Sequence, residues 1–410
     1  MARTLYPQQT TAMNYSASTW SLSDGGVADL SKPVAGDTIL LTANSGAVTC
    51  DEPWAAANLS GSGGTWYFTA QPGTVTGEID LANIAAIANG ASLIVGGDFV
   101  VGAAGTFGLL DDTSINCDTF ELVGTIDTGG NTLTVNGDVL YTAGVVTELN
   151  LTMTGSANTL GWARSGELID LLTLASGATI TTSAVCWMLA IGGTGALVAN
   201  HTVTLHTPTT DFWLLATQVT GNGTISFRNW SDPTTNTSDM DIDCRGGLDI
   251  RYDVDGVLTL AGAIDINARP LAVRGTAIGG SATLTLTGPL TCGTATLGNG
   301  ANTGSGILNL GSGNHSIVGI VMGNATNGAN ALDFGTSSIR LSGTIDGDNI
   351  TFTNTSGVVV LGTIHDVDLT GETPLLHIIP DTAGVDNVNV TDIDGVGGDP
   401  EVYVTVQEKI

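Results

Sequence analysis

Basic side chains are scarce in this chain of 410 residues. Ten Lys and Arg residues stand against 39 Asp and Glu, the formal net charge is −29, and Lys32 and Lys409 are the lysines. Proteins that bind nucleic acid carry a basic footprint that neutralises phosphates. Attraction to an anionic membrane surface also depends on clustered Lys and Arg. The composition therefore argues against both functions, and solubility explains the acidity itself.

Long apolar runs and helical patterns are lacking as well. The sequence contains no apolar run long enough to cross a bilayer, so it predicts no membrane insertion. The N-terminal stretch MARTLYPQQTTAMNYSASTW holds no apolar segment of the kind found in signal peptides, and we expect no such signal. The best candidate for a helix is the short stretch LANIAAIANGA at 81–91.

The cysteines lack the spacing of a metal site or of a disulfide framework. They are widely separated along the chain, no two form a CxxC pair, and their number is odd. We therefore predict buried free thiols that pack as small apolar residues. They are Cys50, Cys117, Cys186, Cys244 and Cys292.

A short phrase of alternating apolar residues returns at nearly constant intervals in the second half of the chain. Alternation is typical of a strand with one buried face, and a fixed return of about 25 residues is typical of stacked repeats. A pair of β-sandwich domains would instead show hairpin signals about every 8–12 residues. The phrase reads LTLAG from Leu258, LTLTG from Leu284, LNLGS from Leu308, LDFGT from Leu332 and VVVLG from Val358.

These patterns predict an all-β fold, a right-handed parallel β-helix that forms a solenoid of about 25-residue coils. Residues 1–75, which contain Trp20, Trp54 and Trp66, are predicted to be an N-terminal cap or anchoring region, because the first coil of a solenoid exposes an open strand edge. Residues 76–371 are predicted to form the β-helix. Residues 372–410 break the repeat and are predicted to be a C-terminal cap or oligomerisation segment.

Within the predicted β-helix, two similar phrases occur, GGDFV at Gly96 and NGDVL at Asn136. Their separation indicates two short coils.

One segment, SDMDIDCRGGLDIRYDVDG at 238–256, sets acids and arginines at alternate positions. Side chains alternate across a strand, so these would line one outer face. Carboxylates at alternate positions on a strand are about 6.5–7 Å apart, a separation that glycoside hydrolysis permits, and an arginine could act as the base of a lyase. If the protein is an enzyme, the candidates are Asp239, Asp241, Asp243, Arg245, Asp249 and Arg251.

The alternative is that these residues form a solvated face, since the outside of a solenoid must be polar and alternating charges compensate one another. We favour this interpretation and predict no enzymatic activity and no cofactor. Substitution of Asp241 and Asp243 by Asn, with an assay of polysaccharide cleavage, separates the two.

Two further sets of residues are weighed for binding. Exposed tryptophans could stack on sugars, with core or cap packing as the alternative, and the candidates are Trp162, Trp187, Trp213 and Trp230. The phrases DGDN and DIDG resemble fragments of calcium loops, but neither completes the pattern with a distal Glu, and Asp in tight turns explains them. We predict no metal; the weak calcium candidates are Asp346, Asp348, Asp392 and Asp394.

Taken together, the repeat, the acidity and the absent export signal resemble the virion surface proteins of tailed phages, which include tail spikes, tail fibres and capsid decoration proteins with pectin-lyase-like solenoids. The segment SKPVAGDTILLTANSG, with Pro33, Gly36 and Asp37, resembles the opening turns of such solenoids. The resemblance implies a structural protein on the virion surface, assembled in the host cytoplasm. Its implied partners are other capsid or tail proteins and a host surface glycan, and its implied state is a homo-oligomer, a trimer.

Two alternatives stay open: a polysaccharide-degrading tail spike, which would be a glycosidase or a lyase, and an extracellular bacterial adhesin exported by a type I route.

Overall fold

The computed structural model describes residues 2–7, 13–17, 19–26, 32–162, 168–206, 213–214, 218–229, 234–238, 242–252, 255–275, 280–298, 304–311, 313–322, 330–333, 338–346, 359–368, 376–378, 390–394 and 402–404. These residues form strands, turns and bends and no helix. In this part of the chain there is accordingly no helix long and apolar enough to span a bilayer. The helix considered for residues 81–91 is wrong, because Ala85–Ala88 forms a strand that pairs on both sides.

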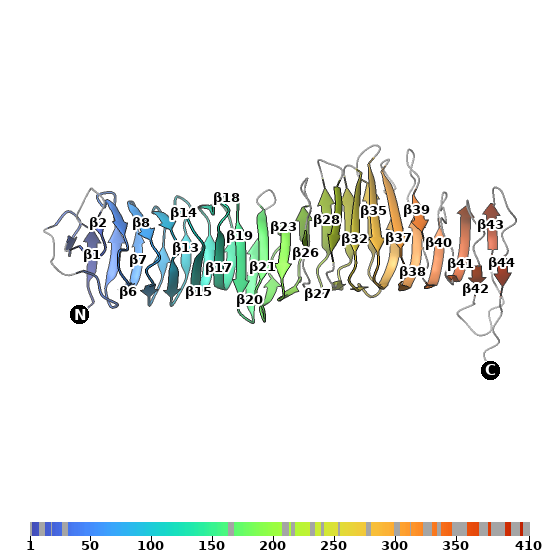
Figure 1. Cartoon of the computed structure of the whole chain (residues 1–410), viewed down its shortest axis with the longest axis horizontal. Helices are drawn as coiled ribbons and strands as arrows, with labels where there is room; N and C mark the ends of the chain where they lie inside the picture. The colour runs from blue at the N-terminus through green and yellow to red at the C-terminus, as the bar shows by residue number, and fades with distance from the viewer. Residues whose placement is uncertain are drawn as a thin grey trace. The chain divides into compact units, whose positions relative to one another are not determined.

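The chain divides into two compact units, Met1–Leu197 and Val198–Ile410. In each unit nearly every strand pairs in parallel with a strand one coil further along the sequence, and Figure 1 shows the strands lying side by side. This confirms the prediction of an all-β parallel solenoid. The boundaries at residues 75 and 371, and the two caps, stay predictions.

Unit 1 contains three stacks of parallel strands. The first consists of β1 (Thr4–Pro7), β4 (Thr38–Leu41), β7 (Asn58–Gly61), β10 (Ile79–Asp80), β13 (Phe99–Val101), the second halves of β15 (Thr113–Leu122) and β17 (Thr132–Tyr141), β20 (Asn158–Trp162), β22 (Thr179–Thr182) and β24 (Ala196–Val198). The second consists of β6 (Trp54–Ala56), β9 (Gly73–Val75), β12 (Ser92–Val95), the first halves of β15 and β17, β19 (Asn150–Thr154), β21 (Ile169–Leu174) and β23 (Cys186–Gly193). The third consists of β2 (Met13–Asn14), β5 (Ala47–Thr49), β8 (Thr65–Phe68), β11 (Ala85–Ala88), β14 (Thr106–Leu109), β16 (Thr125–Asp127) and β18 (Val145–Thr147). The short strand β3 (Trp20–Ser21) pairs antiparallel with β1.

Unit 2 repeats the arrangement. Its first stack consists of β25 (Val203–His206), β28 (Ile225–Asn229), β31 (Leu248–Tyr252), β34 (Leu271–Gly275), the second halves of β36 (Leu290–Leu297), β38 (Asn314–Met322), β40 (Ser338–Asp346) and β41 (Val359–Asp368), and β43 (Val390–Asp394). The second consists of β27 (Gln218–Gly221), β30 (Ile242–Cys244), β33 (Ile264–Asp265), the first halves of those four strands, β42 (Leu376–Ile378) and β44 (Val402–Val404). The third consists of β26 (Trp213–Leu214), β29 (Thr234–Ser238), β32 (Gly256–Leu260), β35 (Ser281–Leu286), β37 (Ser305–Leu310) and β39 (Ala331–Asp333).

The repeated leucine phrase corresponds to the third stack of unit 2. Leu258 pairs in register with Leu284, Leu284 with Leu308, and Leu308 with Leu332, so the predicted repeat is confirmed over these four copies. The fifth copy departs from the prediction, because VVVLG runs into β41, which pairs with β40 in another sheet.

Coils in unit 1 are shorter than the coil length that the leucine phrase predicts. Leu93 pairs with Gly73 on one side and Ile115 on the other, and Ile115 pairs with Val135. Each of these returns is shorter than the interval between Leu258 and Leu284. The two short coils expected between Gly96 and Asn136 are thus present. Shorter turns between the strands account for the difference from unit 2.

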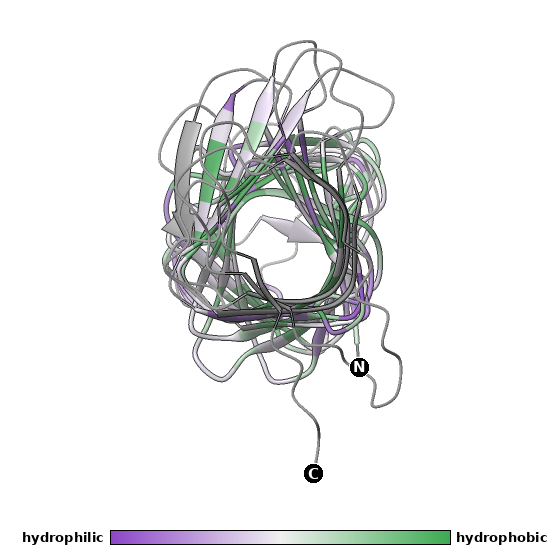
Figure 2. Cartoon of the chain, turned by 90° about the vertical axis from the view of Figure 1, so that its right-hand side faces the viewer, coloured by the Kyte–Doolittle hydropathy of each residue, from purple (hydrophilic) through white to green (hydrophobic). Residues whose placement is uncertain are grey.

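Alternate side chains of the strands fill the interior. All four leucines of the phrase are 0% exposed. Figure 2 shows the strands as successive turns of coiled backbone, coloured by hydropathy. The five cysteines are free and buried, which confirms their predicted role. Burial is the main cause that raises the pKa of the thiols to about 12, and this holds for Cys117, Cys186, Cys244 and Cys292.

Acidic side chains recur at a constant interval at one corner of unit 1. We call Glu78, Asp98, Asp118 and Asp138 the acidic column; Asn58 and Asn158 hold the same spacing at its two ends. The buried Cys117 has its thiol pKa raised first by burial and then by the charges of Asp98, Asp118 and Asp138. Three carboxylates of the column therefore lie near the same thiol.

Neutralising one member of the acidic column should stabilise unit 1. For Asp118→Asn we expect a gain of about 0.5 kcal/mol in the free energy of unfolding, since like charges on neighbouring strands are destabilising by this order. Urea midpoints test this at about 0.01 M salt, and the gain should vanish at about 1 M salt, where screening is strong. Glu121→Gln, on the same strand but outside the column, is the matched control. An equal gain in both variants would show that only net charge matters.

Candidate functional site

An arginine column is the most unusual side-chain arrangement in the described part of this acidic protein. Arg228 of β28, Arg251 of β31 and Arg274 of β34 pair in register on three successive coils of unit 2. All three side chains are half-buried on the outer face. The residue before each arginine is 0% exposed and points into the core, as strand alternation requires; these residues are Phe227, Ile250 and Val273.

The column concentrates charge that the rest of the chain lacks. Half of the ten basic residues lie between positions 228 and 274, since Arg245 and Arg269 also fall there. Neighbouring parallel strands are about 4.8 Å apart, so the three side chains leave the sheet from closely spaced backbone positions. Like charges facing one another on adjacent strands are destabilising unless anions compensate them.

Within the described residues, the three arginines differ in their hydrogen-bond partners. The Nε and Nη2 of Arg274 donate to the two carboxylate oxygens of Asp249, each at 3.1 Å. The Nε of Arg228 donates to Ser226 Oγ at 3.3 Å, and this hydroxyl donates in turn to Asp249 at 3.5 Å. Arg251 lies between them, and its buried Nε has no hydrogen-bond partner in the part of the chain that the structure describes.

A second pair of arginines lies at a corner of the same coils. Arg245 follows β30 and Arg269 precedes β34, and with Asn267 and Ala268 they line a hollow of about 320 Å³. Arg245 and Arg269 are exposed. The hollow lies at the turn that leads into the strands of the arginine column.

The structure describes two of the four aspartates that were candidates for catalysis. Asp239 and Asp241 lie outside the described residues. Asp243 is exposed on β30, whereas Asp249 is half-buried on β31, beyond the turn that contains Arg245. Asp249 is occupied by its ion pair with Arg274, with side chains 16% and 36% exposed respectively. The structure thus brings Asp249 together with arginines and not with a second carboxylate among the described residues.

The tryptophan candidates have different environments. Trp162 is 1% exposed and stacks on Tyr141 with ring centroids 4.4 Å apart, so core packing explains it and its face is closed to sugars. Trp187 is half-buried on the outer side of β23. Trp213 belongs to β26, where side chains are not described, and Trp230 lies outside the described residues.

The calcium candidates fall where side chains are not described. Asp346 ends β40, Asp392 and Asp394 belong to β43, and Asp348 lies outside the described residues. Among the residues that are described, no three His, Cys, Asp or Glu side chains gather in a way that could hold a metal ion.

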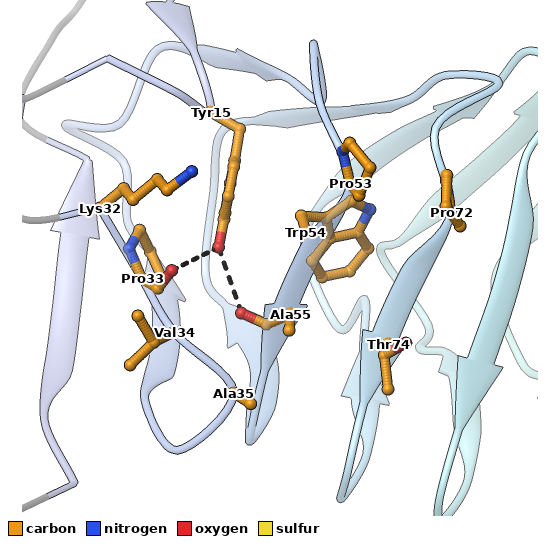
Figure 3. A pocket seen from close by; sticks show the side chains of 10 residues that line it. All are labelled: Tyr15, Lys32, Pro33, Val34, Ala35, Pro53, Trp54, Ala55, Pro72 and Thr74. Atoms are coloured by element: carbon orange, nitrogen blue, oxygen red, sulfur yellow. Dashed lines mark hydrogen bonds between the residues drawn. The ribbon is translucent and has the colours of Figure 1, made fainter.

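A separate hollow of about 370 Å³ lies in the first coils of unit 1. Figure 3 shows the Tyr15 hydroxyl between two carbonyl groups, to which it donates: Pro33 O at 2.7 Å and Ala55 O at 3.2 Å. Burial is the main cause that raises the pKa of Tyr15. Trp54 forms one wall at 3% exposure, and prolines and alanines form much of the rest. Apart from Tyr15, Lys32 and Thr74, the lining is apolar.

His315 is the one buried imidazole in the described part of the chain. It is 4% exposed, and its Nδ1 accepts a hydrogen bond from the backbone N–H of Leu290 at 3.2 Å. Burial lowers its pKa from 6.5 to about 4. The folded protein therefore keeps this side chain neutral at pH values where the unfolded chain takes up a proton.

Unit 2 should accordingly lose stability on mild acidification. The contribution of His315 is complete above pH 6.5 and falls by about 3 kcal/mol as the pH drops to about 4, since the unfolded state binds the extra proton over that interval. His315→Asn keeps an acceptor for Leu290 N–H and should flatten the dependence of the urea midpoint on pH. His201→Asn, which removes an exposed imidazole, is the control. Identical pH profiles for the wild type and the His315→Asn variant would contradict the assignment.

The arginine column has a signal in the sequence that a uniform repeat misses. The phrases FR, IR and VR at 227–228, 250–251 and 273–274 return at a constant interval, which is shorter than the interval between Leu258 and Leu284. The two intervals differ because the arginines lie on strands of the first stack of unit 2 and the leucines on strands of the third stack. A search for a polar side chain at its own spacing would have found the column.

The fold places the chain among the parallel β-solenoid proteins. No protein-family model, no curated protein and no solved structure matches it. The function therefore has to be argued from the fold, the charges and the arginine column.

Proposed function

We propose that this chain is a structural protein on the surface of a tailed phage particle, as a capsid decoration protein or a tail fibre or spike, and that it contacts host glycans. The observation that supports the proposal is the in-register stacking of successive coils in each unit. Such stacks join each coil to its neighbours by backbone hydrogen bonds and a continuous core, which suits a stiff surface element. The strongly negative charge suits a soluble, outward-facing protein.

The proposed role is attachment rather than catalysis, and the proposed assembly is a homo-oligomer held by other virion proteins. The ion pair between Asp249 and Arg274 supports this, because a carboxylate bound by a guanidinium is poorly placed to transfer protons. A glycan-cleaving tail spike is the competing function.

Negative-stain microscopy of purified virions labelled with an antibody to this chain tests the proposal. We expect label at a fixed site, on either the capsid or the tail. Protein found in the culture medium and absent from virions would overturn the proposal in favour of the secreted adhesin. Release of reducing sugars from host capsule by the purified chain would instead favour the glycan-cleaving spike.

A further inference from the structure

We propose that the arginine column of Arg228, Arg251 and Arg274 is a binding site for an acidic polysaccharide, recognised through its carboxylates. The inference rests on the proposed attachment role and deepens it by naming the class of ligand. It begins from a concentration of like charge, since three arginines pair in register on successive strands and Asp249 forms its ion pair with one of them, Arg274.

Arg251 is the member that needs an external partner. It is flanked in register by an arginine on each side, and its buried Nε lacks a hydrogen-bond partner within the described residues. Leaving a buried donor unsatisfied is unfavourable, more so when the group is charged. An anion bound at the column would offset the positive charge of the three arginines.

Asp249 shows which chemistry the column accepts. Its carboxylate binds Arg274 through two parallel hydrogen bonds of 3.1 Å, the planar paired geometry that guanidinium and carboxylate groups favour. A carboxylate that approaches Arg251 from solvent would meet the same kind of group one coil away and could accept hydrogen bonds from its Nη atoms, since Nε is buried. Arginine suits such recognition better than lysine because its donors are fixed in one plane.

The spacing of the column favours a chain of charged sugars over a single ion. Strands at about 4.8 Å separation spread the three guanidinium groups over about 10 Å. A ligand with carboxylates at intervals along its backbone can therefore contact more than one coil. A denser polyanion such as nucleic acid is disfavoured, because the net charge of −29 on the protein repels it outside this patch.

Binding of purified full-length protein to polygalacturonate, measured at about 0.15 M salt, tests the proposal. Arg251→Gln should weaken binding about tenfold, as expected for loss of a charge-assisted contact, and Arg251→Lys should restore part of the loss. Asp249→Asn should strengthen binding, because it removes the internal competitor. Arg245→Gln is the matched control: it deletes the same charge at the exposed corner and should change affinity less than about twofold.

Comparison of different ligands tests whether the site recognises carboxylates. Methyl-esterified polygalacturonate, which has the same backbone without charge, should not bind; inorganic phosphate and single-stranded DNA should bind at least about tenfold more weakly than the free acid. Equal losses for Arg251→Gln and Arg245→Gln, no binding by the wild type, or equal binding of the ester would overturn the site. Preferential binding of DNA or phosphate would overturn the ligand class.

The melting temperature distinguishes a loss of binding from a loss of folding, and the use of purified protein makes the binding result independent of the proposed location on the virion. Arg251→Gln should leave the melting temperature unchanged or raise it, because it relieves repulsion within the column, whereas loss of a purely structural arginine would lower it. The assay uses purified protein, so absence from virions would remove the proposed location without affecting the binding result.

Discussion

Truncation of Leu284 to alanine should lower the free energy of unfolding of unit 2 by about 3–4 kcal/mol, as expected for a large-to-small change at a fully buried site. Leu284 is 0% exposed and stands between Leu258 and Leu308 in the ladder of the third stack. Removing its side chain leaves a cavity lined by these neighbours from the adjacent coils. The cavity cannot close easily, because the backbone hydrogen bonds of the stack hold the coils at a fixed spacing.

Thr283→Ala is the matched control for this change. Thr283 lies next to Leu284 on β35 and is half-buried on the opposite side of the strand. Its truncation should change stability by less than about 0.5 kcal/mol. Urea denaturation gives the difference in stability, and hydrogen exchange localises it. We expect faster exchange in β32, β35 and β37 for Leu284→Ala alone, because each coil of a solenoid contacts mainly its neighbours. Equally mild effects of both substitutions would contradict the assigned core.

The leucine phrase made unit 2 predictable because a stacked core requires the same residue type at the same place on each coil. Four leucines that pair in register mark both the period and the buried face. Unit 1 was harder, because its coils are shorter and its core positions vary among Leu, Ile, Val and Phe. Its acidic column, which does keep a fixed spacing, marks the coil more clearly than its core does.

The mistaken helix at 81–91 has a specific cause. Alanine and isoleucine at 84–88 form a stretch without Gly or Pro, which local propensity does not distinguish from a helix. In the fold, Ala86 and Ala88 alternate into the core while β8 and β14 satisfy the backbone of the strand on both sides. These residues form a strand because they pair with neighbouring coils, and a local sequence pattern does not contain that information.

The candidate site was predictable only in part. The alternation along one strand predicts that Asp249 and Arg251 share a face. It does not connect Arg228 and Arg274 with them, because their relation depends on the register between coils. The interval of the leucine phrase is slightly longer than the interval between the arginines. Applied to Arg251, it therefore points to residues beside Arg228 and Arg274 on the neighbouring strands, not to the arginines themselves.

Substitution of Gly144 by alanine should be among the most damaging single changes in unit 1. Gly144 has a φ of +107°, and a Cβ placed there would lie 1.7 Å from the carbonyl oxygen of Gly124 on the preceding coil. That oxygen also accepts a hydrogen bond from the N–H of Val145 at 3.1 Å, so the two coils cannot separate without breaking it. A further bond, from the Tyr141 hydroxyl to Gly144 O at 3.0 Å, holds the turn from inside.

The expected loss for Gly144→Ala is at least about 3 kcal/mol, of which about 1–2 kcal/mol comes from the positive φ and the rest from forced displacement of the coil. Two other glycines separate these causes. Gly130 has a φ of +81° and no atom within 4 Å of an added Cβ, so Gly130→Ala should lose about 1–2 kcal/mol. Gly36 has open space and no positive φ, so Gly36→Ala should be neutral or stabilising by up to about 1 kcal/mol.

Urea midpoints of the three variants provide the test, and the order of stability should be Gly36→Ala, then Gly130→Ala, then Gly144→Ala. Equal losses at Gly130 and Gly144 would mean that backbone conformation alone limits the turn and that the coils can move apart. The predicted order would instead show that close approach between coils determines which side chains the corner tolerates. The backbone spacing of the arginine column is set by the same stacking of coils in unit 2, so the proposed contact of one ligand with several arginines depends on coils held in register.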